Sequence, residues 1–239
     1  MIICKNCSTD IVQNYCSNCG QPAQLKRIDG HYLAHEMEHI LHFERGILYT
    51  IRELLTNPGK NIKNYLIENR SRLVKPIIFV IVTSLIYSFI SHFFHIEQEY
   101  IQYMEVQKSA TGSIFKWIQA HYGYANIIMG ICIAFWTKLF FRKHGYNLFE
   151  ILILMCFIMG MTMLILAVFS IPSGIFHIDI LQFGGMVCLV YTIWAMGQFF
   201  DKSKISAYLK SLLAYFLGMI SFGIIAILIG VTVDLLFKH

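Results

Sequence analysis

The sequence predicts an all-α integral membrane protein, with about five transmembrane helices preceded by a small Cys4 zinc ribbon and amphipathic interfacial helices. Three observations support this prediction. Of the 239 residues, 56% are hydrophobic and 14% are charged, whereas soluble domains average roughly 45–50% and 25%. The hydrophobic residues form long blocks, which excludes a disordered chain, a secreted disulfide scaffold and a simple cytosolic enzyme. Four cysteines gather near the N-terminus in two C-x-x-C pairs.

The two pairs predict a metal site over residues 1–25. They consist of Cys4 with Cys7 and Cys16 with Cys19, and eight residues separate them. In such a pair the first cysteine ends a strand and the second lies in a tight turn, so four thiolates can reach one tetrahedral ion. Gly20 suits the turn after the second pair. The segment holds too few apolar residues to bury a core, so we expect a structural zinc ion to supply its folding free energy.

Residues 26–75 are expected to form amphipathic helices with an NPG turn. Apolar residues recur at spacings of three and four from His31 to Thr56, and a second amphipathic stretch runs from about Lys60 to Leu73. Asn57-Pro58-Gly59 is expected to end the first helix. We expect both helices to lie on the cytoplasmic membrane surface or against the spans, with their basic residues near anionic headgroups.

The first of these helices carries a stripe of four histidines opposite its apolar face, and two of them belong to a known motif. His35-Glu36-x-x-His39 matches the H-E-x-x-H pattern, in which two imidazoles bind zinc and the glutamate acts as general base. A zinc peptidase also needs a third ligand, and His42 follows too closely to match the patterns that place it past a turn. We therefore favour a polar helix face that docks onto the ribbon or a partner. A metal site on His35 and His39, with Glu36 as catalytic base, is the alternative.

Residues 76–239 are predicted to hold the five membrane spans. A bilayer core of about 30 Å needs roughly 20 apolar residues in a helix. The stretches that meet this requirement are Pro76–Phe94, Ala125–Phe141, Leu148–Ile171, Ile180–Phe200 and Leu209–Phe237. Ionisable residues fall near the span ends, which disfavours a coupled transporter. A spacing of small residues, Ala214-x-x-x-Gly218, is compatible with a homo-oligomer.

The distribution of basic residues predicts a cytoplasmic N-terminus and an outside C-terminus. Of the 19 Lys and Arg residues, only Lys108, Lys116 and Lys238 fall on the side opposite the N-terminal segment. The side rich in Lys and Arg faces the cytoplasm in membrane proteins. Because the cytoplasm is reducing, this orientation favours metal ligation over disulfides at the four cysteines.

Several short motifs occur together in the first 95 residues. They are Phe43-Glu44-Arg45-Gly46-Ile47-Leu48-Tyr49-Thr50, Glu53-Leu54-Leu55, Asn57-Pro58-Gly59, Asn69-Arg70-Ser71-Arg72 and Lys75-Pro76, with a Tyr-Cys-x-x-Cys-Gly segment at Tyr15–Gly20. With these motifs the sequence resembles the bacterial domain-of-unknown-function family 3667. The resemblance implies a multi-pass protein of the bacterial inner membrane. It implies no activity, because the family has none assigned.

Three functional hypotheses follow from the sequence. We favour a binding role, as an adaptor or regulator that uses the ribbon or the histidine-bearing helix to hold a protein partner. The first alternative is a membrane metallopeptidase that uses His35, Glu36 and His39. The second is a transporter or lipid-handling protein. The expected surroundings are a lipid bilayer, and a nucleic acid partner is disfavoured.

Overall fold

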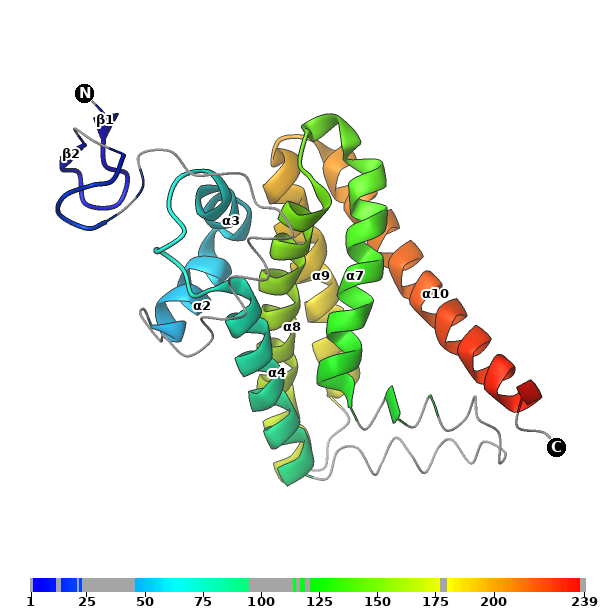
Figure 1. Ribbon diagram of the computed structural model, residues 1–239. Helices are drawn as coiled ribbons and strands as arrows, with labels where there is room; N and C mark the ends of the chain where they lie inside the picture. Colours follow the sequence, from blue (N-terminus) through cyan, green and yellow to red (C-terminus); the bar gives the residue numbers. More distant parts are fainter. Residues whose placement is uncertain are drawn as a thin grey trace.

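The computed structural model describes residues 2–11, 14–20, 22, 46–94, 114, 117–118, 121–176 and 180–236. A small two-stranded sheet precedes a set of helices (Figure 1). The elements in chain order are β1 (Ile2–Ile3), β2 (Asp10–Ile11), α2 (Ile47–Thr56), α3 (Pro58–Ile67), α4 (Pro76–Phe93), α7 (Tyr122–Phe140), a short 3-10 helix (Arg142–His144), α8 (Leu148–Phe176), α9 (Leu181–Asp201) and α10 (Ile205–Leu236).

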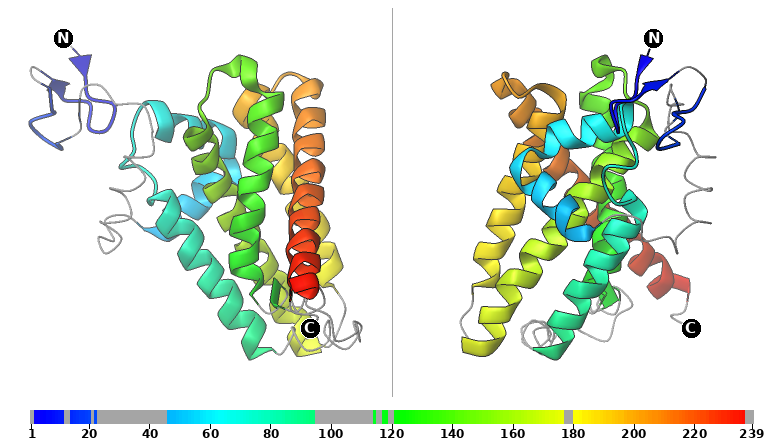
Figure 2. Two further views of the ribbon diagram at one scale, coloured as in Figure 1. Left: turned by 45° about the vertical axis from the view of Figure 1, so that its right-hand side comes forward. Right: turned by 90° about the vertical axis from the view of Figure 1, so that its left-hand side faces the viewer.

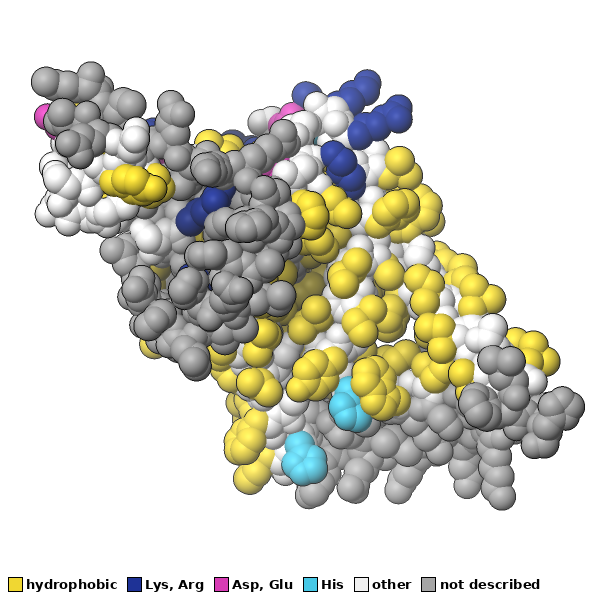
Figure 3. Space-filling view, in the orientation of Figure 1, with side chains coloured by type: hydrophobic (Ala, Val, Ile, Leu, Met, Phe, Trp, Pro, Cys, Tyr) yellow, Lys and Arg dark blue, Asp and Glu magenta, His cyan; other side chains and the backbone are white. Residues whose placement is uncertain are grey.

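Five of these helices are long and apolar enough to cross a membrane, namely α4, α7, α8, α9 and α10. Apolar side chains cover much of the flank of the bundle, as a surface in contact with lipid requires (Figure 3). The predicted all-α, multi-pass membrane fold is therefore confirmed.

Helix α8 lies at the centre of the bundle and α10 at its edge. α8 packs against α4, α7 and α9, whereas α10 packs against α7 and α9. In their most apolar windows, 72% of α8 but only 17% of α10 is buried. Phe79 of α4 and Phe157 of α8 are fully buried where these two helices meet, with their ring centroids 5.9 Å apart. The far end of α10 diverges from the other helices (Figures 1 and 2).

The span boundaries differ most from the predicted ones in two places. α8 continues through Pro172 to Phe176, although we expected a connection to begin at this proline. Proline is tolerated in membrane helices because neighbouring groups satisfy the backbone carbonyl that it leaves free. α10 begins at Ile205, one turn before the predicted start at Leu209.

The α2–α3 hairpin packs against the spans, which was one of the two predicted positions. The NPG turn ends α2 as expected, but Pro58 and Gly59 already form the first turn of α3, where proline is favoured. The last carbonyls of α2 find partners outside their own helix. Asn61 Nδ2 donates to Glu53 O at 2.8 Å, and the Tyr191 hydroxyl of α9 donates to Leu54 O at 3.2 Å.

Side-chain hydrogen bonds also fix the segment that leads from α3 into α4. The backbone N–H of Val74 donates to the fully buried hydroxyl of Thr50, at 3.0 Å. Arg72 donates to the Tyr49 hydroxyl at 2.9 Å and to a Glu53 carboxylate oxygen at 3.1 Å. The start of the first span is thus tied to α2.

Candidate metal centre

The N-terminal residues form two small hairpins that face each other. β1 and β2 pair antiparallel, with Ile3 opposite Asp10. Tyr15 and Pro22 form an isolated antiparallel bridge. Each hairpin carries one C-x-x-C pair at its tip. Cys4 directly follows β1, as the predicted ribbon requires.

The two tips share the same backbone hydrogen bond and the same backbone conformation. The N–H of Ser8 donates to Cys4 O at 2.9 Å, and the N–H of Gly20 donates to Cys16 O at 2.9 Å. The residue after each pair has a positive φ, 60° at Ser8 and 72° at Gly20. This conformation favours glycine, so the predicted role of Gly20 is confirmed. We call these tips the first knuckle (residues 4–8) and the second knuckle (residues 16–20).

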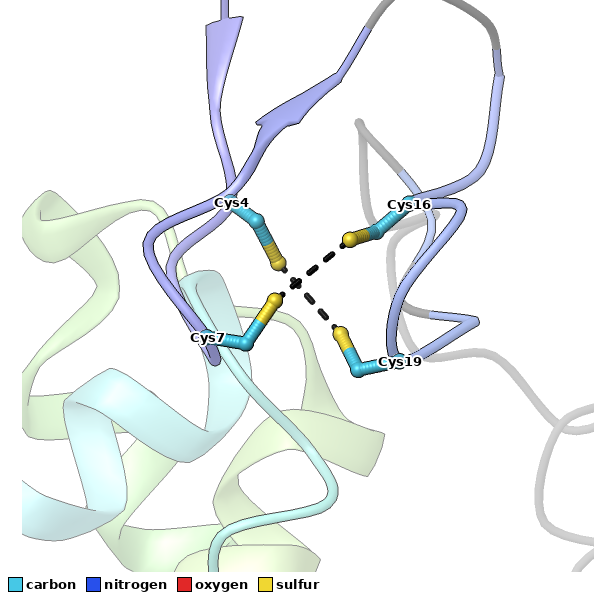
Figure 4. Close-up of side chains that lie close together, drawn as sticks. All are labelled: Cys4, Cys7, Cys16 and Cys19. Carbon is cyan, nitrogen blue, oxygen red and sulfur yellow. Dashed lines mark hydrogen bonds between the residues drawn. The ribbon is translucent and has the colours of Figure 1, made fainter.

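The four sulfurs converge on one point between the knuckles (Figure 4). Cys4 Sγ lies 3.5 Å from Cys19 Sγ, and Cys7 Sγ lies 3.5 Å from Cys16 Sγ. All four sulfurs lie within 4.8 Å of one another. A tetrahedral ion with Zn–S bonds of about 2.3 Å places its sulfurs about 3.8 Å apart. The spacing therefore fits a tetrahedral ion held by four thiolates.

The thiols differ in their electrostatic environments. The hydroxyl and the backbone N–H of Thr9 stabilise the Cys7 thiolate and lower the pKa of Cys7 to about 6. At Cys16 the backbone N–H of Cys19 favours the thiolate, but burial and the neighbouring sulfurs prevail and raise the pKa of Cys16 to about 11. Four crowded sulfurs cannot all ionise at neutral pH without a cation. A bound metal ion would supply that positive charge.

The first knuckle docks on the end of α3. Asn69 Nδ2 donates to Asn6 Oδ1 at 2.9 Å, and Lys5 Nζ lies 3.7 Å from Glu68 Oε1. Asn69 is buried, and its Oδ1 accepts hydrogen bonds from the backbone N–H and the hydroxyl of Ser71. The ribbon is thereby joined to the turn that precedes the first span.

The second knuckle presents an exposed surface. Tyr15 and the knuckle residues Ser17, Asn18, Cys19 and Gly20 are exposed, although Cys16 is buried. The two knuckles therefore have different surroundings. The first knuckle contacts the helical bundle, whereas the second is exposed. Figure 2 shows the ribbon beyond α3, at the margin of the bundle.

Sequence reasoning found the cysteines but missed Asn6, Thr9 and Asn69. An asparagine between two cysteines carries no signal by itself, since its partner Asn69 is 63 positions away in the chain. Thr9 lies two residues after Cys7, and its hydroxyl is 3.3 Å from the Cys7 sulfur. The Asn6–Asn69 contact thus depends on tertiary structure, whereas the Thr9 contact is local to the first hairpin.

The histidine-bearing segment lies outside the described residues. His35, Glu36 and His39 therefore stay a sequence prediction, both as a docking face and as the alternative zinc peptidase motif. The three remaining cysteines, Cys132, Cys156 and Cys188, lie in the spans α7, α8 and α9 and are free thiols, buried or half-buried. In the described part of the chain, the group that could hold a metal ion consists of the four ribbon cysteines.

Comparison with known proteins supports the resemblance seen in the sequence. Comparison with curated proteins and with solved structures gave no match. A family defined as "Protein of unknown function (DUF3667)" matches residues 44–88. This region contains α2, α3 and most of α4, together with the hydrogen bonds of Thr50, Glu53 and Arg72 that join them. Over this segment the chain carries the sequence pattern of DUF3667, and the predicted resemblance to this family is confirmed there.

Proposed function

We propose that this chain is an adaptor of the bacterial inner membrane, whose cytoplasmic Cys4 zinc ribbon is held on the membrane bundle by one knuckle and binds a protein with the other. The observation that carries the proposal is the difference between the two knuckles. Asn6 of the first knuckle is hydrogen-bonded to the bundle at 2.9 Å, whereas Cys19 of the second knuckle is exposed.

Zinc is the metal that best suits the donor set. Four thiolates in a tetrahedral arrangement are typical of structural zinc sites, and they leave no open position for catalysis. The buried cluster of the ribbon consists of Ile11 with Cys4 and Cys16, and Cys7 packs against it. So small an apolar core supplies little folding free energy, which is the situation in which zinc binding and folding coincide.

The distribution of charge supports a cytoplasmic ribbon. The described Lys and Arg residues lie in the ribbon, in α2 and α3, in the turn before α4 and at the span ends on that side. A group of them is visible at the upper end of the bundle (Figure 3). The positive-inside rule assigns such an end to the cytoplasm.

A protein partner fits the exposed surface better than a charged polymer does. The side chains of Ile3 and Tyr15 are 62% and 65% exposed. Exposed aromatic and aliphatic side chains are typical anchors of protein interfaces. Lys5 is the described basic residue of the ribbon, and it already contacts Glu68. The surface therefore favours an apolar protein contact.

Metal content of the full-length protein in detergent tests the first half of the proposal. We expect one zinc per chain, lost in the Cys16→Ser/Cys19→Ser variant and retained in a His35→Ala/His39→Ala variant. A second metal that is lost with the histidines would instead support the peptidase alternative. Absence of metal from the wild type, purified without chelators, would contradict the ribbon site.

Site-specific photo-crosslinking in cells tests the second half. A photoreactive residue at Tyr15 should give a discrete protein adduct, which disappears when Cys16→Ser/Cys19→Ser is added. The same residue at Ser203, an exposed position between α9 and α10, is the matched control and should give no such adduct. Equal adducts at both positions, or adducts that persist without the cysteines, would contradict an adaptor role of the ribbon.

A further inference from the structure

A cavity with several polar side chains in its lining lies within the bundle, among α7, α8, α9 and α10. Its volume is about 60 Å³, and its lining includes Asn126, Met159, Thr162, Cys188 and Thr192. Thr162 lies near the middle of α8 and Thr192 near the middle of α9. Asn126 lies one turn after the start of α7, so the cavity extends from the middle of the bundle toward the end at which α7 begins.

Asn126 is a buried side chain of this cavity whose amide nitrogen lacks a hydrogen-bond partner. It is 3% exposed, and its Nδ2 has no hydrogen bond to any group in the described part of the chain. An amide that is buried without a partner costs about 1–3 kcal/mol. Because the side chain is buried within the protein, bulk water does not reach it to remove that cost. A bound molecule that accepts a hydrogen bond from Asn126 would remove it.

Two threonine hydroxyls of the lining can accept hydrogen bonds. Thr162 donates to Met159 O at 2.8 Å, and Thr192 donates to Cys188 O at 2.8 Å. Because each hydroxyl hydrogen is used within its own helix, the oxygens offer lone pairs to a ligand. The cavity thus combines a free donor at Asn126 with acceptors at Thr162 and Thr192.

Size and charge limit what the cavity can hold. Pockets for drug-sized molecules measure about 300–1,000 Å³, so a cavity of about 60 Å³ excludes a lipid or a large substrate. A buried water needs roughly 10–15 Å³ on this scale, so about four waters fit. The lining residues include no Asp, Glu, Lys, Arg or His, so the site suits a neutral molecule rather than an ion.

We infer that the cavity is a binding site for a cluster of water molecules within the helical bundle. Asn126 Nδ2 donates to this cluster, and the Thr162 and Thr192 hydroxyls accept from it. The site is separate from the ribbon and does not depend on the adaptor role.

X-ray hydroxyl-radical footprinting of the purified protein tests this inference. The X-ray beam converts water into hydroxyl radicals, and radicals formed from bound water oxidise the side chains beside it. Radicals formed in bulk solvent do not reach buried side chains. Met159 lines the cavity, and Met155 on the same helix is not part of the lining. Both are 2% exposed, so Met155 is a matched control. We expect Met159 to be oxidised several-fold faster than Met155, and equal rates in the wild type would overturn the inference.

Two variants identify the groups that hold the water. Asn126→Leu removes the donor, and Thr192→Val removes an acceptor while keeping the side-chain shape. Each should lower the oxidation of Met159 toward that of Met155. Size-exclusion chromatography checks that each variant is folded. If Asn126→Leu does not fold, the comparison of Thr192→Val with the wild type still tests the inference. Unchanged Met159 oxidation in the folded variants would also overturn the inference.

Discussion

Thr9 makes Cys7 an easily ionised thiol. Its hydroxyl and backbone N–H favour the thiolate, and the pKa of Cys7 falls from 9.0 to about 6. A lowered pKa keeps the thiolate populated above that pH and lets protons displace it only below. Cys7 can therefore bind a metal ion at neutral pH without losing a proton first.

Release of zinc at low pH checks this environment. Protons compete with the metal for each thiolate, and a thiol with a lowered pKa resists this competition down to lower pH. Thr9→Val should raise the pKa of Cys7, so the midpoint of zinc release should move to higher pH. A chromogenic zinc chelator measures the release curve of each protein. Ser17→Ala, at an exposed position of the second knuckle, is the control and should leave the midpoint unchanged. Equal midpoints in the wild type and in Thr9→Val would show that Thr9 does not stabilise the Cys7 thiolate.

At the residue scale the sequence predicted the ligands but not their partners. Cys4, Cys7, Cys16 and Cys19 were identifiable because metal geometry constrains the spacing within each pair. Asn69 was seen only as part of a family motif, and the structure gives it a role as the contact between ribbon and bundle. No rule of local spacing connects positions 6 and 69.

Among the helices, Gly59 allows the closest approach between α3 and α9. A Cβ atom at this position would lie 2.3 Å from the backbone carbonyl carbon of Gln198 and 2.4 Å from the backbone nitrogen of Phe199. Backbone atoms in a helix cannot move aside cheaply, so any side chain here would separate the two helices. The close contact between α3 and α9 thus explains why a glycine occupies this position of the NPG turn.

Gly59→Ala should therefore destabilise the protein by about 1–3 kcal/mol, the usual range for overpacking a buried contact. Gly223→Ala in α10 is the matched control, since a Cβ there meets nothing within 4 Å. Alanine favours a helix over glycine by up to about 1 kcal/mol, so the control should be neutral or stabilising. Thermal unfolding in detergent measures both. Equal melting shifts would show that Gly59 does not hold α3 close to α9.

Thr50 joins α2 to the start of the first span. Thr50→Val keeps the shape of the side chain but leaves the N–H of Val74 without its acceptor, which costs about 1–3 kcal/mol. Thr56→Val is the control, because the Thr56 hydroxyl contacts carbonyls of its own helix and is exposed. The melting temperature should fall clearly in the first variant only. A similar melting temperature in both variants would mean that the Thr50 contact contributes little.

The elements themselves were largely predictable, whereas their contacts were not. Hydropathy located all five spans, since the bilayer imposes one length on every crossing helix. It misplaced the end of α8, because a rule for soluble helices was applied to Pro172. It also left open whether α2 and α3 lie on lipid or on protein. The hydrogen bond from Tyr191 to Leu54, across 137 positions, is of the kind that no periodicity reveals.

For the whole molecule, the arrangement of charge and helices predicts one orientation. The ribbon and the described end of α10 lie at opposite ends of the bundle (Figure 1), as expected for five crossings. The basic span ends lie on the side of the ribbon. From the positive-inside rule we predict that His121, at the start of α7, lies outside and that Ser203, between α9 and α10, lies in the cytoplasm.

Cysteine labelling in intact cells tests this orientation. A membrane-impermeant maleimide should label a His121→Cys variant in cells whose inner membrane is intact, and a Ser203→Cys variant only after that membrane is permeabilised. Both positions are exposed, so a difference reports the side of the membrane rather than burial. Peptide mass spectrometry separates these sites from the native cysteines. The reverse pattern would move the ribbon outside, into an oxidising compartment where disulfides compete with zinc, and the cytoplasmic adaptor role would then be wrong.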